Sequence, residues 1–138
     1  MMPDIKRLLR AKPLFIIAIS YSIVISFLFF MPSSDLPKVN IKMEGLDKVV
    51  HFGIHFILIN LWMLYFYAKN DFQFRAKWLL PLFLSLMLFG IIVEILQGQF
   101  TDSRGADIFD VAANLLGASL GILFFRIVKN NLKFKNFN

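Results

Sequence analysis

Four long apolar runs constrain what this chain can fold into more than any other feature of its sequence. A helix rises about 1.5 Å per residue and the apolar core of a bilayer is about 30 Å thick, so each run is long enough to cross a membrane. The sequence therefore predicts an all-α membrane protein, a single domain over residues 1–138 built as a bundle of four transmembrane helices. The predicted helices span residues 14–31, 49–67, 78–96 and 108–125.

The composition favours the same class of protein. Hydrophobic residues make up 58% of the chain and aromatic residues 16%. A soluble domain of 138 residues buries only about two thirds of its surface, so it has no room for this much Phe, Leu and Ile. The absence of cysteine from the sequence excludes disulfide frameworks, thiolate metal sites and cysteine nucleophiles.

The positive charge is placed as in a membrane protein with a fixed topology. The net charge is +6, and most basic residues fall before the first run, between the second and third, and after the fourth. Cytoplasmic connections carry such an excess of Lys and Arg, so both termini are expected in the cytoplasm. This pattern needs no nucleic-acid partner to explain it. The residues concerned are Lys6, Arg7, Arg10, Lys12, Lys69, Arg75, Lys77, Arg126, Lys129, Lys133 and Lys135.

Three of the predicted helices carry polar side chains near the end that is expected to face outward. Their spacings of three, four or seven residues put them on one face of each helix. An ionisable residue at the centre of a membrane helix costs about 2.5–3.5 kcal/mol, so such residues face the bundle interior and pair with one another. We therefore expect an outward-facing polar pocket. The polar positions are Asp47, His51 and His55, then Glu94 and Gln97, then Asp107, Asp110 and Asn114. The core of the pocket would be Asp47, His51, Glu94, Gln97, Arg104, Asp110 and Asn114.

Two glycines continue the polar face of the fourth predicted helix. Gly117 and Gly121 are separated by three residues in the segment GASLG. Small residues at this spacing let another membrane helix approach closely. We interpret this pair as a helix-packing surface.

The polar segments in their order along the chain resemble a known family. The set comprises DKVVHF at the start of the second helix, EILQ at the end of the third, and the pattern R-x-x-D-x-x-D-x-x-x-N-x-x-G-x-x-x-G from Arg104 to Gly121. This combination is similar to the VanZ-like family of small bacterial membrane proteins. His55 departs from it, because the family more often carries Tyr or another large residue there, and TDS precedes Arg104 where Pro is common.

The resemblance implies a four-helix protein of the bacterial cytoplasmic (inner) membrane with a role in the cell envelope. The family takes its name from a protein associated with low-level resistance to the glycopeptide teicoplanin. By resemblance, ligand binding would involve Asp47, Lys48, His51, Glu94, Gln97, Arg104, Asp110 and Asn114.

The sequence leaves several functions open for the polar set. It is compatible with an interhelical network that only fixes packing. It is compatible with a binding pocket in which Arg104 and Lys48 hold an anionic group of a lipid-linked cell-wall intermediate or a glycopeptide, with membrane lipid around the acyl part. It is also compatible with a hydrolase or transferase whose catalytic candidates are His51, Glu94 and Asp110. A proton or solute pathway is a fourth option.

No cofactor or metal is expected from the sequence. His51 and His55 are four residues apart, with carboxylates elsewhere in the set, and both types of side chain bind zinc. However, HFGIH lacks the glutamate of the H-E-x-x-H zinc motif. The oligomeric state cannot be read from these patterns.

Overall fold

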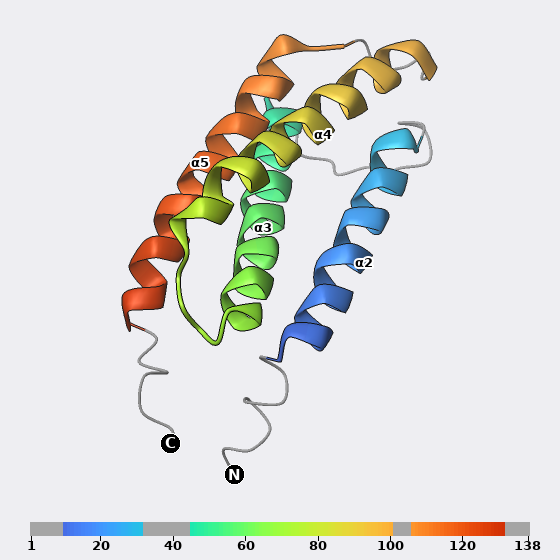
Figure 1. The fold of residues 1–138 in the computed structure, drawn as a ribbon. Helices are drawn as coiled ribbons and strands as arrows, with labels where there is room; N and C mark the ends of the chain where they lie inside the picture. Colours follow the sequence, from blue (N-terminus) through green and yellow to red (C-terminus); the bar gives the residue numbers. More distant parts are fainter. Residues whose placement is uncertain (1–9, 32–44, 101–105, 132–138) are drawn as a thin grey trace.

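The chain forms four long α-helices and one short 3-10 helix in the computed structural model, which describes residues 10–31, 45–100 and 106–131 (Figure 1). No strand occurs in these residues. All four helices are long and apolar enough to cross a membrane. The prediction of an all-α, four-helix, multi-pass membrane protein is therefore confirmed. The elements are α2 (Ala11–Phe30), α3 (Leu46–Lys69), η1 (Ala76–Trp78), α4 (Leu79–Phe100) and α5 (Ile108–Asn131).

The helices extend beyond the apolar runs from which they were predicted. α3 starts three residues earlier than expected, so that Asp47 lies in its first turn, and α5 continues to Asn131. Polar residues at a membrane interface can continue a helix, which hydropathy alone does not register. The first turns of α2 and α4 contain Pro13 and Pro81, where proline's missing N–H has no intrahelical partner to lose.

The four helices run antiparallel to their neighbours in sequence (Figure 1). The start of α2, the end of α5 and the α3–α4 connection lie at one end of the bundle. The start of α3, the end of α4 and the start of α5 lie at the other end. This arrangement brings the polar ends of three helices together.

α3 and α5 form the closest helix pair, and glycine is the reason. A side-chain carbon added at Gly117 would overlap the carbonyl oxygen of Phe52 and lie 2.9 Å from its carbonyl carbon. One added at Gly121 would collide with Ile59 and come within 2.8 Å of Asn60 Nδ2. The missing side chains therefore let the two backbones touch.

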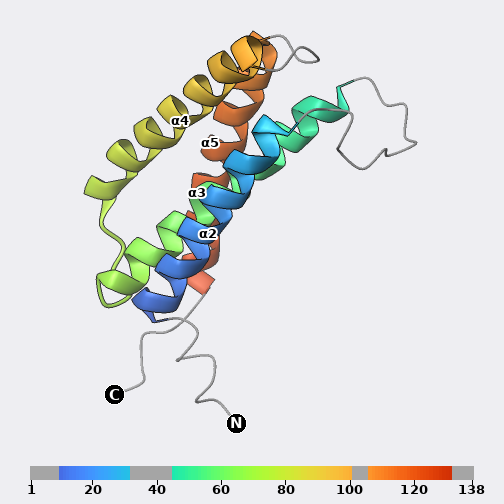
Figure 2. The same ribbon diagram turned by 90° about the vertical axis from the view of Figure 1, so that its right-hand side faces the viewer.

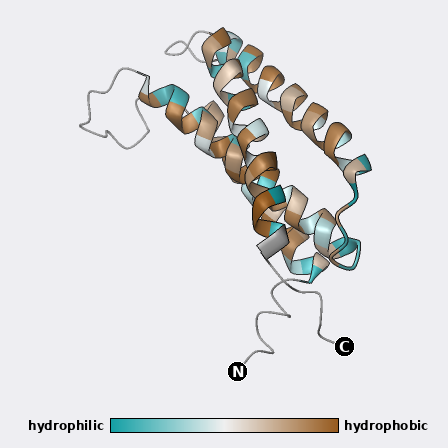
Figure 3. Ribbon diagram, turned by 90° about the vertical axis from the view of Figure 1, so that its left-hand side faces the viewer, coloured by the Kyte–Doolittle hydropathy of each residue, from teal (hydrophilic) through white to brown (hydrophobic). Residues whose placement is uncertain are grey.

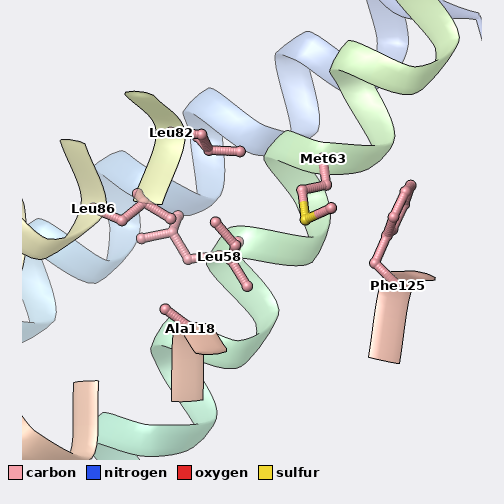
Figure 4. Packing of buried hydrophobic residues seen from close by; sticks show 7 residues of the cluster. Leu58, Met63, Leu82, Leu86, Ala118 and Phe125 are labelled. Carbon is pink, nitrogen blue, oxygen red and sulfur yellow. The ribbon is translucent and has the colours of Figure 1, made fainter. Parts of the chain in front are cut away.

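The apolar core lies between α3, α4 and α5. Leu58 and Ile59 of α3 are almost completely buried, and Leu58 faces leucines of α4 and a small residue of α5 (Figure 4). Farther along α3, Met63 faces a phenylalanine near the end of α5. The cluster comprises Leu58, Ile59, Met63, Leu82, Leu86, Ala118 and Phe125.

The outer surface of the bundle is apolar, as a lipid-facing surface must be. Phe27, Leu80 and Leu116 are 72%, 65% and 60% exposed. Hydrophobic colour covers most of the helix lengths, with hydrophilic segments concentrated at the ends (Figure 3). α4 meets α5 near its C-terminal end and diverges from it toward its N-terminal end, where Trp78 stacks on Phe66 of α3 with 5.1 Å between ring centroids (Figure 2).

Candidate functional site

Lys48 is the centre of an ion-pair network at the polar end of the bundle. Its ammonium group donates to Asp107 Oδ2 at 2.8 Å and to Asp47 Oδ2 at 3.0 Å. Asp110 Oδ1 lies 3.5 Å from the same nitrogen. Lys48 thus links the first turn of α3 to the start of α5, and its charge is already matched by carboxylates.

Asp107 organises the start of α5 in three ways. Its carboxylate accepts from the Phe109 N–H at 2.8 Å, which makes it the side-chain cap of the helix. The same carboxylate binds Lys48. Its own backbone N–H donates to Glu94 Oε1 at 2.7 Å. The Lys48 ammonium and the Phe109 N–H hold the pKa of the Asp107 carboxyl below its ordinary value.

His51 occupies the buried centre of the site. Its Nδ1 lies 3.2 Å from Asn114 Oδ1, and its Nε2 lies 3.7 Å from Asp110 Oδ2. On another side, its ring stacks at a tilt against Phe29, with 5.0 Å between ring centroids. All three polar side chains are buried, with exposed fractions of 4–8%. Such burial is tolerated in a membrane bundle because these groups contact one another.

His55 lies one turn deeper, where a glycine of α4 leaves room for it. A side-chain carbon added at Gly90 would come within 3.0 Å of both His55 Nε2 and Asn114 Nδ2. His55 Nδ1 lies 3.3 Å from the His51 carbonyl oxygen. Its Nε2 has no hydrogen-bond partner in the described part of the chain. The ring also contacts Phe89, at 6.2 Å between centroids.

Gln97 is buried and joins the end of α4 to the end of α2. Its amide Nε2 donates to the Phe29 carbonyl oxygen at 2.8 Å. Phe29 is in the last turn of α2, where carbonyl groups lack an intrahelical donor. Gln97 therefore caps the end of α2 and ties it to the end of α4.

The structure divides the residues that the sequence assigned to ligand binding. It places Lys48, His51, Glu94, Asp110 and Asn114 in one cluster, which we call the polar cluster. Asp47 lies at its rim with an exposed side chain, and Arg104 lies outside the described residues.

Two participants were missed or undervalued by the sequence reasoning. Asp107 was placed in the polar set but not among the ligand-binding residues, although its spacing of three from Asp110 puts both on one face. Gly90 was not considered at all. The sequence feature that could have indicated it is a small residue four positions before Glu94, on the same face of α4.

Among the described residues, two groups of side chains have the composition of a metal site. His51, Glu94 and Asp110 each offer one ligand atom, and these atoms lie within 4.8 Å of one another. The same holds for Asp47, Asp107 and Asp110, but the Lys48 ammonium already contacts that group.

A hollow between α2, α3 and α4 lies deeper in the bundle than the polar cluster and approaches it at Phe89. Its volume is about 380 Å³, and we call it the lateral groove. It is lined mainly by apolar side chains, and along α4 it extends from Trp78 to Phe89, roughly 16 Å at 1.5 Å per residue. Phe89, which contacts His55, is five residues before Glu94. A second hollow of about 400 Å³, beside Lys12 and Lys69, lies at the opposite end.

The comparisons with known proteins agree with this architecture. A model of the VanZ/LLP1 family matches residues 14–129. An uncharacterised protein of the fission yeast Schizosaccharomyces pombe, C11E3.10, is 32% identical over 123 residues, covering 89% of this chain and 68% of that protein. No solved structure matches the chain at a significant level. With most of its length matched by the family model, this four-helix membrane protein belongs to the VanZ/LLP1 family.

Proposed function

We propose that this protein binds a lipid-linked ligand whose hydrocarbon chain lies in the lateral groove and whose head group meets the polar cluster. One observation carries the proposal: an apolar groove of about 380 Å³ ends at Phe89, which contacts His55 directly below the cluster. Ligand sites combine an apolar cavity with a few convergent polar groups in this way.

The lining of the groove fits a hydrocarbon chain. Trp62, Phe66 and Leu86 contribute to its walls, and these side chains offer dispersion contacts and no charge. Its polar members, Ser22 and Ser85, donate their hydroxyl hydrogens to carbonyl oxygens of their own helices. A chain from the surrounding lipid would therefore meet no unsatisfied donor along these two positions.

The cluster favours a head group that donates hydrogen bonds. Its described carboxylates, including those of Glu94 and Asp110, outnumber its single ammonium group, which already binds Asp107. Sugar hydroxyls and amides suit carboxylate and amide acceptors. A phosphate at this place would need a further cation, and Arg104 is the residue we expect to supply it.

We place this activity in a bacterial cytoplasmic membrane, with the polar cluster facing outward. The ligand class would then be a lipid-linked cell-wall intermediate, and its capture would alter susceptibility to glycopeptides such as teicoplanin. The positive-inside distribution of Lys and Arg supports the orientation. The resemblance of the polar segments to the VanZ-like family supports a role in the cell envelope.

The groove is tested by filling it. Ser85→Trp places an indole in the groove, whereas Leu84→Trp adds the same group at a neighbouring position that is 50% exposed. Both variants and the wild type are purified in mild detergent, and the lipids that remain bound are identified by native mass spectrometry. We expect a bound lipid-linked species in the wild type and in Leu84→Trp, and its loss from Ser85→Trp. Equal lipid content in all three proteins would refute the proposal.

The polar cluster is tested in cells. A host expressing the wild type is compared with hosts expressing Glu94→Gln, Arg104→Ala or Asp110→Asn, at matched membrane abundance, in a teicoplanin susceptibility assay. Loss of the wild-type effect with unchanged abundance supports a binding role for the cluster. Loss of abundance in all three variants indicates instead that the charges serve only to hold the helices together.

Chemistry on the same ligand is a second candidate, favoured by the contact between His51 and Asp110. An imidazole nitrogen 3.7 Å from a carboxylate is close enough for Asp110 to stabilise the imidazolium that forms when His51 takes up a proton as a general base. Incubation with a lipid-linked pyrophosphate substrate would release a water-soluble product if the protein is a hydrolase. Asp110→Asn should then lose turnover while retaining the lipid, and a wild type without turnover excludes this candidate for that substrate.

A further inference from the structure

The buried part of the polar cluster has the features of a metal site. His51 of α3, Glu94 of α4 and Asp110 of α5 come from three helices, and each offers one ligand atom within 4.8 Å of the other two. We propose that these three side chains bind one divalent transition-metal ion, such as Zn²⁺ or Mn²⁺. The inference goes beyond lipid binding and does not depend on the lateral groove.

Two carboxylate oxygens in this group have no hydrogen bond from the described residues. They are Glu94 Oε2 and Asp110 Oδ1, which belong to side chains of residues that are only 4% and 8% exposed. Asp110 Oδ1 is within 3.5 Å of the Lys48 ammonium, but Glu94 Oε2 has no such neighbour among the described ion pairs. Buried carboxylate oxygens need a partner, and a metal ion would supply one to Glu94 Oε2.

The orientation of His51 suits a ligand. An amide oxygen accepts and does not donate, so the contact between His51 Nδ1 and Asn114 Oδ1 puts the hydrogen of a neutral ring on Nδ1. Nε2 then presents its lone pair toward Asp110 Oδ2, at 3.7 Å. Two lone pairs facing each other repel unless a proton or a metal ion lies between them, and a metal ion would bind Glu94 as well. Metal-binding histidines commonly donate their other ring N–H to such an oxygen, which fixes the ring.

The separations are close to those of a bound metal. Ligand bonds of about 2.0–2.2 Å in a tetrahedral site leave the ligand atoms about 3.4 Å apart. The distance of 3.7 Å between His51 and Asp110 is near this value, and the ligand atom of Glu94 lies within 4.8 Å of both, so binding would draw it closer. Three protein ligands leave a fourth position open, as in zinc sites that bind water or a substrate.

The composition of the site selects the class of metal. One imidazole and two carboxylates suit Zn²⁺ or Mn²⁺ better than Mg²⁺, which prefers oxygen ligands alone. A divalent ion also balances the two carboxylates of Glu94 and Asp110. The other acidic group, around Asp107, already has the Lys48 ammonium as its cation.

The pair of histidines considered from the sequence is not the metal pair in this structure. His55 turns its Nδ1 toward the His51 carbonyl oxygen and its Nε2 toward Gly90. His55 is absent from the groups whose ligand atoms converge. It therefore serves as the matched control for His51.

Metal binding to the purified wild type is the first measurement. The protein is stripped with a chelator in detergent micelles and titrated with Zn²⁺, Mn²⁺ and Mg²⁺ by calorimetry, and its metal content is then measured by mass spectrometry. We expect one Zn²⁺ or Mn²⁺ per chain and weaker binding of Mg²⁺. A wild type that retains no stoichiometric Zn²⁺ or Mn²⁺ overturns the inference, whether or not it binds lipid.

Variants assign the ion to the three side chains. His51→Gln, Glu94→Gln and Asp110→Asn should each lose binding, whereas His55→Gln and Asp47→Asn should retain it. Asn114→Ala, which leaves the ligands in place, should weaken binding by about 10- to 100-fold. Binding that survives in His51→Gln and Glu94→Gln would overturn the assignment. If a ligand variant does not fold, the visible spectrum of Co²⁺ in the wild type decides, since a nitrogen ligand and low coordination number give it a characteristic intensity.

Discussion

The close contact of α3 and α5 gives the sharpest prediction of stability. Gly117→Ala adds one carbon, which would overlap the Phe52 carbonyl oxygen and lie 2.9 Å from the carbonyl carbon. Ordinary van der Waals contact begins at 3.4 Å. The obstacle is backbone, which cannot rotate out of the way as a side chain can. The two helices must therefore move apart over several turns, at least far enough to lengthen the distance from the added carbon to the Phe52 carbonyl carbon from 2.9 to 3.4 Å.

The expected cost follows from this separation. Overpacking a well-packed contact by one carbon typically costs about 1–3 kcal/mol, and we expect Gly117→Ala to fall in that range. Gly121→Ala meets side-chain atoms of Ile59 and Asn60, which can adjust, and its added carbon stays 3.1 Å from the nearest backbone atom, the Phe56 carbonyl oxygen. Its cost should therefore be smaller. Gly53→Ala is the matched control, because its added carbon meets nothing within 4 Å among the described residues. Its effect should lie between zero and a gain of about 1 kcal/mol from the helix propensity of alanine.

Reversible unfolding in lipid bicelles measures the three variants on one scale. The free energy of unfolding is obtained for each and compared with the wild type. Far-ultraviolet circular dichroism checks that helix content is unchanged before the titration. A Gly117→Ala protein within about 0.5 kcal/mol of Gly53→Ala, the usual spread for neutral surface changes, would refute the reasoning on helix contact.

Three further predictions concern the ends of the bundle. Gln97→Leu removes the donor to the Phe29 carbonyl oxygen, so unfolding should show a loss of about 1–3 kcal/mol; an unchanged free energy would mean that α2 is capped otherwise. Because Lys48 holds the folded pKa of Asp107 below its unfolded value, the contact stabilises the fold above pH ~4 and this stability is lost as the pH falls through the folded pKa. Melting temperatures between pH 7 and pH 3 should therefore fall less steeply in Asp107→Asn, and parallel curves would contradict this. A cysteine at exposed Gln73 should react with a membrane-impermeant reagent only after cells are permeabilised, and labelling of intact cells would reverse the proposed topology.

The two histidines of α3 show where sequence reasoning stops. Their spacing of four residues places both on one face, and the sequence allowed no distinction between them beyond family resemblance. In the structure, His51 contacts Asn114 and Asp110. His55 instead contacts the His51 carbonyl oxygen and occupies the space left by Gly90. The difference depends on which residues of α4 and α5 lie opposite each ring, and spacing within one helix contains no such information.

The sequence by itself determined the number of helices, their approximate limits and the end at which the polar groups gather. These properties follow from local physics, because the length of an apolar run and the spacing of residues on a helix face depend on nearby residues alone. Only the tertiary structure decided that Lys48 pairs with Asp107, that Gln97 caps α2, and that His51, Glu94 and Asp110 converge. Those contacts depend on the rotation and relative height of separate helices, which close packing of the whole bundle sets.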